Sequence, residues 1–208
     1  MLKIFSFTLL IISFVLISCA KKDDSSSSST TTTYTTSTSG VTASGSITIG
    51  SDTISGTYAT QCVSSADSSA PSDATHLGFV IVVTSDDSFT KEINYYKDST
   101  CTPSSHSLGW YYNNDNVSIG DASGSDYKVT YTQLNQTFLA ATTAGKTHID
   151  GIFSSCCSVD VTVGTATVIT SNTAMYNLIR VSGGKLYIGS QSGSAYPSTG
   201  GEANYDKQ

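Results

Sequence analysis

Cys19 carries the first thiol of the chain and stands directly after a short apolar segment. Lys3 gives the start of the chain a positive charge, and the apolar segment runs from Ile4 to Ile17. A helix needs about 20 apolar residues to span a bilayer, so this segment is too short for a mature transmembrane helix. A positive start followed by a short apolar run is typical of a secretory signal peptide. The pattern predicts that residues 1–18 are removed on export.

The residues around this thiol form a more specific pattern. Leu16-Ile17-Ser18-Cys19 resembles the lipobox of bacterial lipoproteins, in which branched or small residues precede a cysteine. In that family the thiol receives a diacylglycerol, cleavage occurs before the cysteine, and the freed amine is acylated, for example with palmitate. The resemblance implies lipidation of Cys19 and attachment to a membrane through the N-terminal lipid. The alternative is an ordinary secretory signal cut near Ala20, which leaves the cysteine without a role.

Ala20 would be the second residue of the mature lipoprotein. In Gram-negative lipoproteins an aspartate at this position is associated with retention in the inner membrane, and alanine is not that signal. The resemblance therefore implies a location in the bacterial cell envelope, with the outer membrane as the anchoring membrane. Whether the folded part faces the periplasm or the exterior stays open.

Four further cysteines remain when Cys19 is set aside. Export places Cys62, Cys101, Cys156 and Cys157 where disulfides persist, and four cysteines allow three pairings. The adjacent residues 156 and 157 point to opposite faces if they lie in a strand, or they form a vicinal disulfide. No Cys-x-x-Cys or cysteine–histidine spacing indicates a metal site, so structural disulfides are the favoured use.

The remaining reactive residue types form no catalytic motif. His76, His106 and His148 lie far apart, and none has a metal-binding spacing around it. Gly145-Lys146-Thr147 lacks the earlier glycine of a phosphate-binding loop, and Gln191 occupies the position where a nucleophile elbow has serine. The sequence predicts no enzyme, no metal and no cofactor.

Acidic residues outnumber basic ones. The chain has 16 Asp and Glu against 10 Lys and Arg, a net charge of −6, and removal of residues 1–18 takes away one more positive charge. Without a basic stripe the surface has nothing with which to neutralise phosphates, so nucleic acid is not an expected partner. Only 12% of residues are charged. That fraction, with abundant Ser, Thr, Gly and Tyr, is typical of an exported β-protein.

A Ser/Thr tract follows the predicted lipid site. Of the 15 residues 25–39, 14 are Ser or Thr, and Tyr34 is the exception. Such a tract buries too little apolar area to offset the entropy of the chain, which predicts a disordered tether. The expected organisation is a signal peptide over residues 1–18, a lipidated cysteine with a disordered Ser/Thr-rich linker over 19–45, and one folded domain over 46–208.

Short apolar runs separated by turn-forming clusters fill the folded part. Residues 79–83 are continuously apolar, and residues 89–96 alternate. The run 175–181 is followed by Ser182-Gly183-Gly184 and the run 185–188, which predicts a hairpin. A minor helix or 3₁₀ turn is expected near residues 133–141. Strands recurring about every 8 to 12 residues predict one all-β domain, an antiparallel β-barrel, with a β-sandwich as the alternative.

Three short strings in this domain resemble, in the same order, the pattern of a known family. They are Gly56-Thr57-Tyr58 with Cys62, the segment Tyr96-Lys97-Asp98-Ser99-Thr100-Cys101, and Lys185-Leu186-Tyr187-Ile188-Gly189 followed by Pro197 and Tyr205. They resemble bacterial lipocalin-like lipoproteins with an APCDD1-type domain, although Cys156 and Cys157 are additions to the pattern. The resemblance implies a lipocalin-like barrel and a disulfide between Cys62 and Cys101.

Aromatic residues gather in one predicted strand pair. Inside a barrel, Tyr95, Trp110 and Tyr112 would line a pocket for a small apolar ligand, while core packing is the commoner role of such residues. The predicted function is that of a lipid-anchored, non-catalytic envelope lipoprotein whose barrel binds a small hydrophobic ligand or a surface partner. The alternative is a structural or adhesive surface lipoprotein with no ligand pocket.

Overall fold

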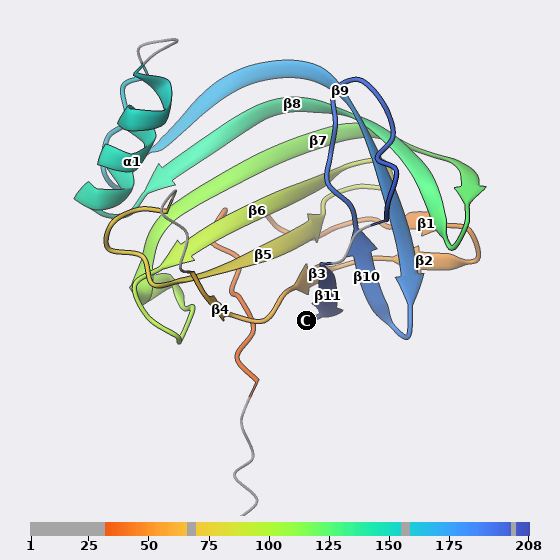
Figure 1. Cartoon of the computed structure of the whole chain (residues 1–208), viewed down its shortest axis with the longest axis horizontal. Helices are drawn as coiled ribbons and strands as arrows, with labels where there is room; N and C mark the ends of the chain where they lie inside the picture. The colour runs from red at the N-terminus through yellow and green to blue at the C-terminus, as the bar shows by residue number, and fades with distance from the viewer. Residues whose placement is uncertain (1–31, 66–69, 155–158, 201–202) are drawn as a thin grey trace, which may run out of the picture. The chain divides into compact units, whose positions relative to one another are not determined.

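The chain forms a closed antiparallel β-barrel of eight strands with one short α-helix (Figure 1). The structure is a computed structural model, which describes residues 32–65, 70–154, 159–200 and 203–208. The predicted all-β barrel is confirmed, and the β-sandwich alternative is wrong. The predicted signal peptide, the predicted lipid site Cys19 and the adjacent residues Cys156 and Cys157 lie outside the described residues.

Hydrogen bonds connect the barrel strands in the order β3-β11-β10-β9-β8-β7-β6-β5, and β5 pairs with β3 to close the ring. The start of β5 also pairs with the short strand β4. The predicted hairpin is confirmed as the turn between β9 and β10. The elements are β1 (Ile47–Ile49), β2 (Asp52–Ile54), β3 (Thr57–Ala59), β4 (Val63–Ser64), β5 (His76–Val83), β6 (Phe89–Tyr96), the 3₁₀ helix η1 (Pro103–Ser105), β7 (His106–Ser123), β8 (Asp126–Ala140), α1 (Thr143–Phe153), β9 (Ala166–Ser182), β10 (Lys185–Ile188) and β11 (Asn204–Lys207).

Strands β7, β8 and β9 are much longer than the others and arch over the barrel interior (Figure 1). Their pairing shifts register at several points, including Asn113/Asn114 in β7 and Gln133/Asn135 in β8. Bulges increase local twist and bend a strand. Asn116 and Asn172 lie near such irregular stretches and have positive φ angles of 55° and 50°. Asparagine adopts this backbone region more readily than most residues, so it suits these positions. The curvature therefore has a local cause in the sequence.

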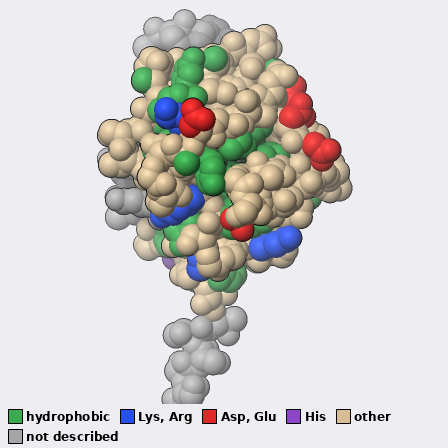
Figure 2. All heavy atoms as spheres, turned by 90° about the vertical axis from the view of Figure 1, so that its right-hand side faces the viewer, with side chains coloured by type: hydrophobic (Ala, Val, Ile, Leu, Met, Phe, Trp, Pro, Cys, Tyr) green, Lys and Arg blue, Asp and Glu red, His purple; other side chains and the backbone are tan. Residues whose placement is uncertain are grey.

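A separate hairpin fills part of the barrel. Strands β1 and β2 pair only with each other and insert Ile47, Ile49 and Ile54 into the main hydrophobic core. In this core Phe89 packs edge-to-face on Tyr131, with ring centroids 5.1 Å apart. The space left among these side chains is about 10 Å³, about the volume needed for one water molecule. Figure 2 shows hydrophobic side chains gathered at the centre of the face at the right of Figure 1, among polar and backbone atoms.

Helix α1 packs on β7 and β8 over a second apolar cluster. Thr142 caps its N-terminus, with the Gly145 amide donating to the Thr142 hydroxyl over 3.0 Å, and Ile149 is fully buried against Leu108 and Phe138. The prediction of a helix or turn near residues 133–141 is wrong, since residues up to Ala140 continue β8. The pairing of β8 with both neighbours overrides local preference there.

Residues 34–44, called the strap from here on, lie against the outer face of the barrel. Tyr34 bridges to Gln61, the Thr35 amide donates to Thr60, and the Ser44 amide donates to the Val83 carbonyl. The linker predicted over residues 19–45 therefore includes a segment that the structure places on the domain. Composition indicated disorder because the strap has little apolar surface, but its hydroxyls and amides bind polar groups of the barrel instead.

The predicted disulfide between Cys62 and Cys101 is confirmed, with a sulfur–sulfur distance of 2.04 Å. It joins the segment after β3 to the connection between β6 and β7. A link across about 40 residues stabilises a domain by roughly 3 to 4 kcal/mol in the chain-entropy model. Within the described residues, no helix has both the length and the apolar character needed to cross a membrane.

Candidate functional site

Strand β6 carries two charged residue types side by side, and they face opposite sides of the barrel wall. Successive side chains of a strand alternate between faces, so Lys91 shares a face with Phe89, and Glu92 does not. Phe89 belongs to the main core, which places Lys91 inside the barrel. Glu92 accepts a hydrogen bond from Ser37 of the strap and therefore lies on the outer face.

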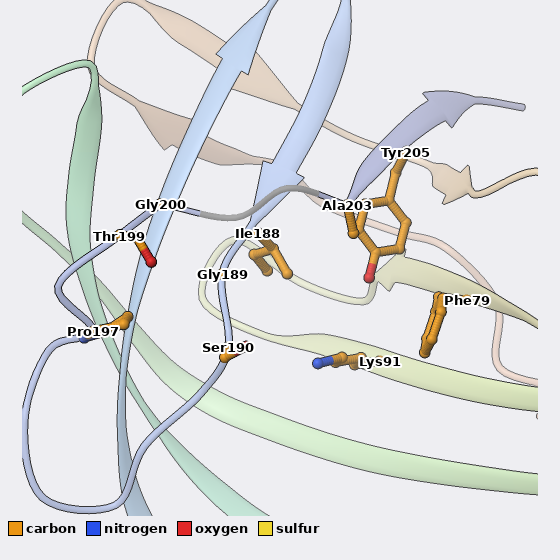
Figure 3. A pocket seen from close by; sticks show the side chains of 10 residues that line it. All are labelled: Phe79, Lys91, Ile188, Gly189, Ser190, Pro197, Thr199, Gly200, Ala203 and Tyr205. Carbon is orange, nitrogen blue, oxygen red and sulfur yellow. The ribbon is translucent and has the colours of Figure 1, made fainter. Parts of the chain in front are cut away.

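A cavity of about 350 Å³ lies inside the barrel at Lys91 (Figure 3). Its walls come from β5, β6, β10, β11 and the connection between β10 and β11. Such a volume is at the lower end of the range of small-molecule sites. The lining residues are Phe79, Lys91, Ile188, Gly189, Ser190, Pro197, Thr199, Gly200, Ala203 and Tyr205.

Polar contacts hold the connection between β10 and β11 in place. The Asn177 side chain donates to the Gly189 carbonyl over 3.0 Å. Gly200 lies so close to the Asp126 carboxylate that a Cβ atom at this position would collide with it. Asp126 in turn accepts from Arg180 over 2.8 Å in an ion pair. The cavity wall is therefore fixed by buried and partly buried groups on β8 and β9.

Lys91 places an ammonium group in surroundings that do not favour a charge. The side chain is partly buried, and burial lowers the pKa of Lys91 below its usual value of 10.5. No ion pair or side-chain hydrogen bond of Lys91 occurs within the part of the chain that the structure describes. Its cross-strand neighbour on the same face is Tyr112. Burial and the nearby Tyr95 raise the pKa of Tyr112 to about 12.

Hydroxyl groups provide the other polar atoms of the cavity. Figure 3 shows the Tyr205 hydroxyl directed from β11 toward Phe79 and Lys91. Tyr205 is buried, and burial raises its pKa, so the phenol is protonated at neutral pH and can donate a hydrogen bond. Ser190 and Thr199 add two more hydroxyls on the connection between β10 and β11. The cavity thus combines one ammonium, several hydroxyls and apolar walls.

Glu92 has the opposite surroundings on the outer face. It is fully buried, and its two oxygens accept four hydrogen bonds. Oε1 accepts from the hydroxyls of Ser37 at 2.7 Å and Ser39 at 2.6 Å, and Oε2 accepts from the Thr38 amide at 3.0 Å and Asn94 Nδ2 at 2.8 Å. Three of the four donors belong to the strap. Glu92 therefore fixes the strap to β6.

A buried polar cluster extends from Glu92 along the same face. The Thr38 hydroxyl contacts Asn94, Tyr111 and His106, and the Tyr96 hydroxyl donates to the Thr36 carbonyl over 2.7 Å. Burial lowers the pKa of His106 to about 4, against weaker upward effects of a backbone hydrogen bond and of Glu92. The same burial raises the pKa values of Tyr96 and Tyr111. All these groups have partners, which is typical of a structural network.

The aromatic residues predicted to line a pocket do face the barrel interior. Trp110 stacks on Tyr112 with a centroid distance of 5.7 Å, and its indole N–H donates to Gln136 over 3.0 Å. Trp110 also packs on Phe138, and Tyr95 lies against His148 of α1. These residues belong to or border the second apolar cluster under α1. Tyr112 alone among the three predicted residues pairs directly with Lys91, and none of the three lines the cavity.

The three histidines remain apart in the structure: His76 lies on β5, His106 on β7 and His148 on α1. Among the residues that the structure describes, no three His, Cys, Asp or Glu side chains gather closely enough to hold a metal ion.

Sequence reasoning did not select Lys91. The signal was present in the alternation of β6, because Lys91 has the same parity as the apolar residues Phe89 and Ile93. A charged residue on the apolar parity of a strand either needs a partner inside the fold or lines a cavity.

Comparison with protein families finds no family model that matches the chain, and comparison with curated proteins finds no match. The assignment of a function therefore depends on the residues and the geometry described above.

Proposed function

We propose that the chain is a lipid-anchored lipoprotein of the bacterial cell envelope, in the outer membrane, whose lipocalin-like barrel binds a small molecule with an apolar part and does not catalyse a reaction. The single observation that carries the ligand-binding role is the 350 Å³ cavity at Lys91, inside a barrel whose main core is otherwise filled. A cavity of this size, with apolar walls and an ammonium group, can admit and orient a small molecule.

Two observations support export and anchoring. The string Leu16-Ile17-Ser18-Cys19 follows a signal-like apolar run, and the domain contains the disulfide between Cys62 and Cys101. Disulfides of this kind persist in oxidising compartments such as the periplasm and the cell surface. Acylation of Cys19 would give the domain a membrane partner.

The filled main core favours a second candidate function. Ile47, Ile49 and Ile54 occupy the space that a ligand takes in an open barrel. A structural or adhesive surface lipoprotein needs no ligand, and in that role the cavity at Lys91 would contain only water. The two candidates therefore differ in whether this cavity has a specific occupant.

Native mass spectrometry of the lipoprotein purified from its own host separates these candidates. A ligand-binding barrel retains a small molecule, which is released on unfolding. Ser190→Trp places a large side chain at the cavity and should abolish retention, whereas Ser194→Trp, on the same connection but outside the cavity lining, should leave it unchanged. Wild-type protein that carries no small molecule would contradict the ligand-binding role.

Replacement of the lipobox cysteine tests the anchor. Cys19→Ala should leave uncleaved or differently cleaved precursor and abolish partitioning into the detergent phase. Ser18→Ala keeps a small residue before the cysteine and should be processed like the wild type. A Cys19→Ala protein that is processed and still partitions into detergent would remove the lipoprotein assignment.

A further inference from the structure

Lys91 gives the cavity a chemical preference, because its ammonium is the only cation among the described residues that line it, and the other described lining groups are apolar groups, hydroxyls and backbone. From this composition we infer that the ligand is a small amphipathic anion, with a carboxylate or comparable anionic group bound by Lys91 and an apolar part against Phe79 and Ile188. The inference rests on the proposed ligand-binding function and specifies the class of ligand.

An anionic group meets the needs of Lys91 better than a neutral one. An ammonium inside a protein loses hydration, and that loss is offset only by hydrogen bonds or by an opposite charge. A neutral apolar ligand would displace water from Lys91 and replace none of its hydrogen bonds. A carboxylate would supply both the charge and the acceptor atoms.

The hydroxyls that line the cavity together with Lys91 suit the same group. Tyr205 is protonated and can donate, and the hydroxyls of Ser190 and Thr199 can rotate to donate as well. A carboxylate accepts through two oxygens and can use several donors at once. A cationic ligand could also bind these hydroxyls, but the positive charge of Lys91 would repel it and oppose its binding.

The acidic group that lies against Gly200 in this wall is already paired. Asp126 lies against Gly200, but its carboxylate binds Arg180 over 2.8 Å. Glu202 is the acidic residue nearest to Gly200 in the sequence, and it lies outside the described residues. Glu202→Gln therefore belongs in the experiment, because a lysine neutralised by Glu202 would bind anions more strongly in this variant.

The size of the cavity limits the ligand. About 350 Å³ accommodates a compact molecule rather than a long acyl chain. Phenylbutyrate, phenylbutanol and phenylbutylamine share one carbon skeleton and differ in the head group, which is anionic, neutral and cationic respectively. Together they separate the effect of charge from that of apolar contact.

Isothermal titration calorimetry of the full-length lipoprotein in a mild detergent, with these three probes, tests the inference. Phenylbutyrate should bind at least about tenfold more tightly than phenylbutanol, since a charge-assisted hydrogen bond contributes that much or more, and phenylbutylamine should bind most weakly. Lys91→Met should remove the preference, and Lys91→Arg should retain it. Lys97→Met is the matched control, because it changes the net charge equally at an exposed position, and it should bind like the wild type.

Each other outcome has a distinct meaning. Equal binding of phenylbutyrate and phenylbutanol, unaffected by Lys91→Met, would overturn the anionic class and leave a ligand-binding barrel. A stronger preference for phenylbutyrate in Glu202→Gln supports the class and identifies an internal competitor. Failure of all three probes overturns the inference for compact amphiphiles, and the proposed function fails with it only if host-purified protein also carries no small molecule.

Discussion

Lys91 and Glu92 are neighbours in sequence, yet their surroundings differ completely. The Glu92 carboxyl group on the outer face accepts four hydrogen bonds from the strap and from Asn94. The Lys91 ammonium on the inner face has no such partners among the described residues and borders a cavity. Strand β6 thus carries one charged group, Glu92, that stabilises the fold and another, Lys91, that can bind a ligand. The difference indicates that a charged group without hydrogen-bond partners among the described residues, rather than a buried charged group as such, is the better candidate for a functional residue on this barrel.

The largest effect is expected on the outer face. Glu92→Gln keeps the shape but turns an NH₂ group toward hydrogen-bond donors, so we expect a loss of about 3 kcal/mol in the free energy of unfolding. Urea denaturation measures it. Thr90→Val is the matched change on the same face of β6, where one hydrogen bond to Asn113 is lost, and it should cost about 1 kcal/mol. Equal effects of the two variants would show that the Glu92 network has no special weight.

The polar cluster under the strap should also make stability depend on pH. His106 has a pKa of about 4 in the folded protein, below the usual 6.5, so the unfolded chain binds more protons between these values. The contribution is complete above pH 6.5 and is lost as the pH falls toward 4, a change of about 3 kcal/mol. The groups that act on His106 include Glu92, the Tyr96 ring and the Thr38 hydroxyl, which contacts His106 Nε2.

Urea midpoints across this pH range test that dependence. His106→Gln should flatten the decline between pH 6.5 and 4. An unchanged slope in His106→Gln would mean that other groups control the acid stability of the domain.

A smaller effect is expected where the strap crosses β5. A Cβ atom at Gly78 would collide with the Thr35 side chain, whose buried hydroxyl has no hydrogen-bond partner. Gly78→Ala should therefore destabilise the domain by about 2 kcal/mol and expose the strap to proteases. Gly120→Ala, where the nearest side-chain atom is 3.6 Å away, is the control.

Thr35→Ala decides whether the collision is the cause. This change removes the hydroxyl, which is the atom nearest to the added Cβ, but keeps the Thr35 Cβ at 2.7 Å from it, so it should be nearly neutral in the wild type and should recover part of the stability lost in Gly78→Ala. Strictly additive effects in the double variant would mean that Gly78 is needed for another reason.

The smallest effect concerns the inner face at alkaline pH. Burial lowers the pKa of Lys91, so the folded protein releases this proton before the unfolded chain does, and the stability contributed by Lys91 rises as the pH approaches 10.5. Buried tyrosines, including Tyr112 and Tyr205, act in the opposite direction because their pKa values are raised. The difference in unfolding free energy between wild type and Lys91→Met isolates the lysine. This difference should shift in favour of the wild type as the pH rises, and a flat difference would show that Lys91 titrates normally.

The sequence predicted the barrel because its signals were local. Alternating strands and the turn at Ser182-Gly183-Gly184 appear in the structure. The disulfide between Cys62 and Cys101, which the family resemblance implied rather than a local signal, appears there as well. The strap was missed because its order depends on Glu92, which is more than 50 residues away. Composition reports how much apolar surface a segment can bury, and it does not report hydrogen bonds to a distant strand.

The candidate site was predicted less well than the fold. Tyr95, Trp110 and Tyr112 face the interior as expected, but the cavity is formed by β5, β6, β10, β11 and a connecting segment. Which strands enclose a space depends on barrel closure and on how the β1–β2 hairpin fills the remainder. Neither follows from the periodicity of a single strand.

The free energy of unfolding of Lys91→Met, without ligand and with saturating phenylbutyrate, tests the central claim most directly. If Lys91 serves a ligand rather than the fold, the variant is at least as stable as the wild type without ligand, because it removes a poorly partnered charge. Phenylbutyrate then stabilises the wild type, by about 2.7 kcal/mol at a hundredfold excess over its Kd, and stabilises the variant much less. A variant that is less stable than the wild type by 1 kcal/mol or more without ligand, or that phenylbutyrate stabilises equally, would contradict the account and make Lys91 a structural residue.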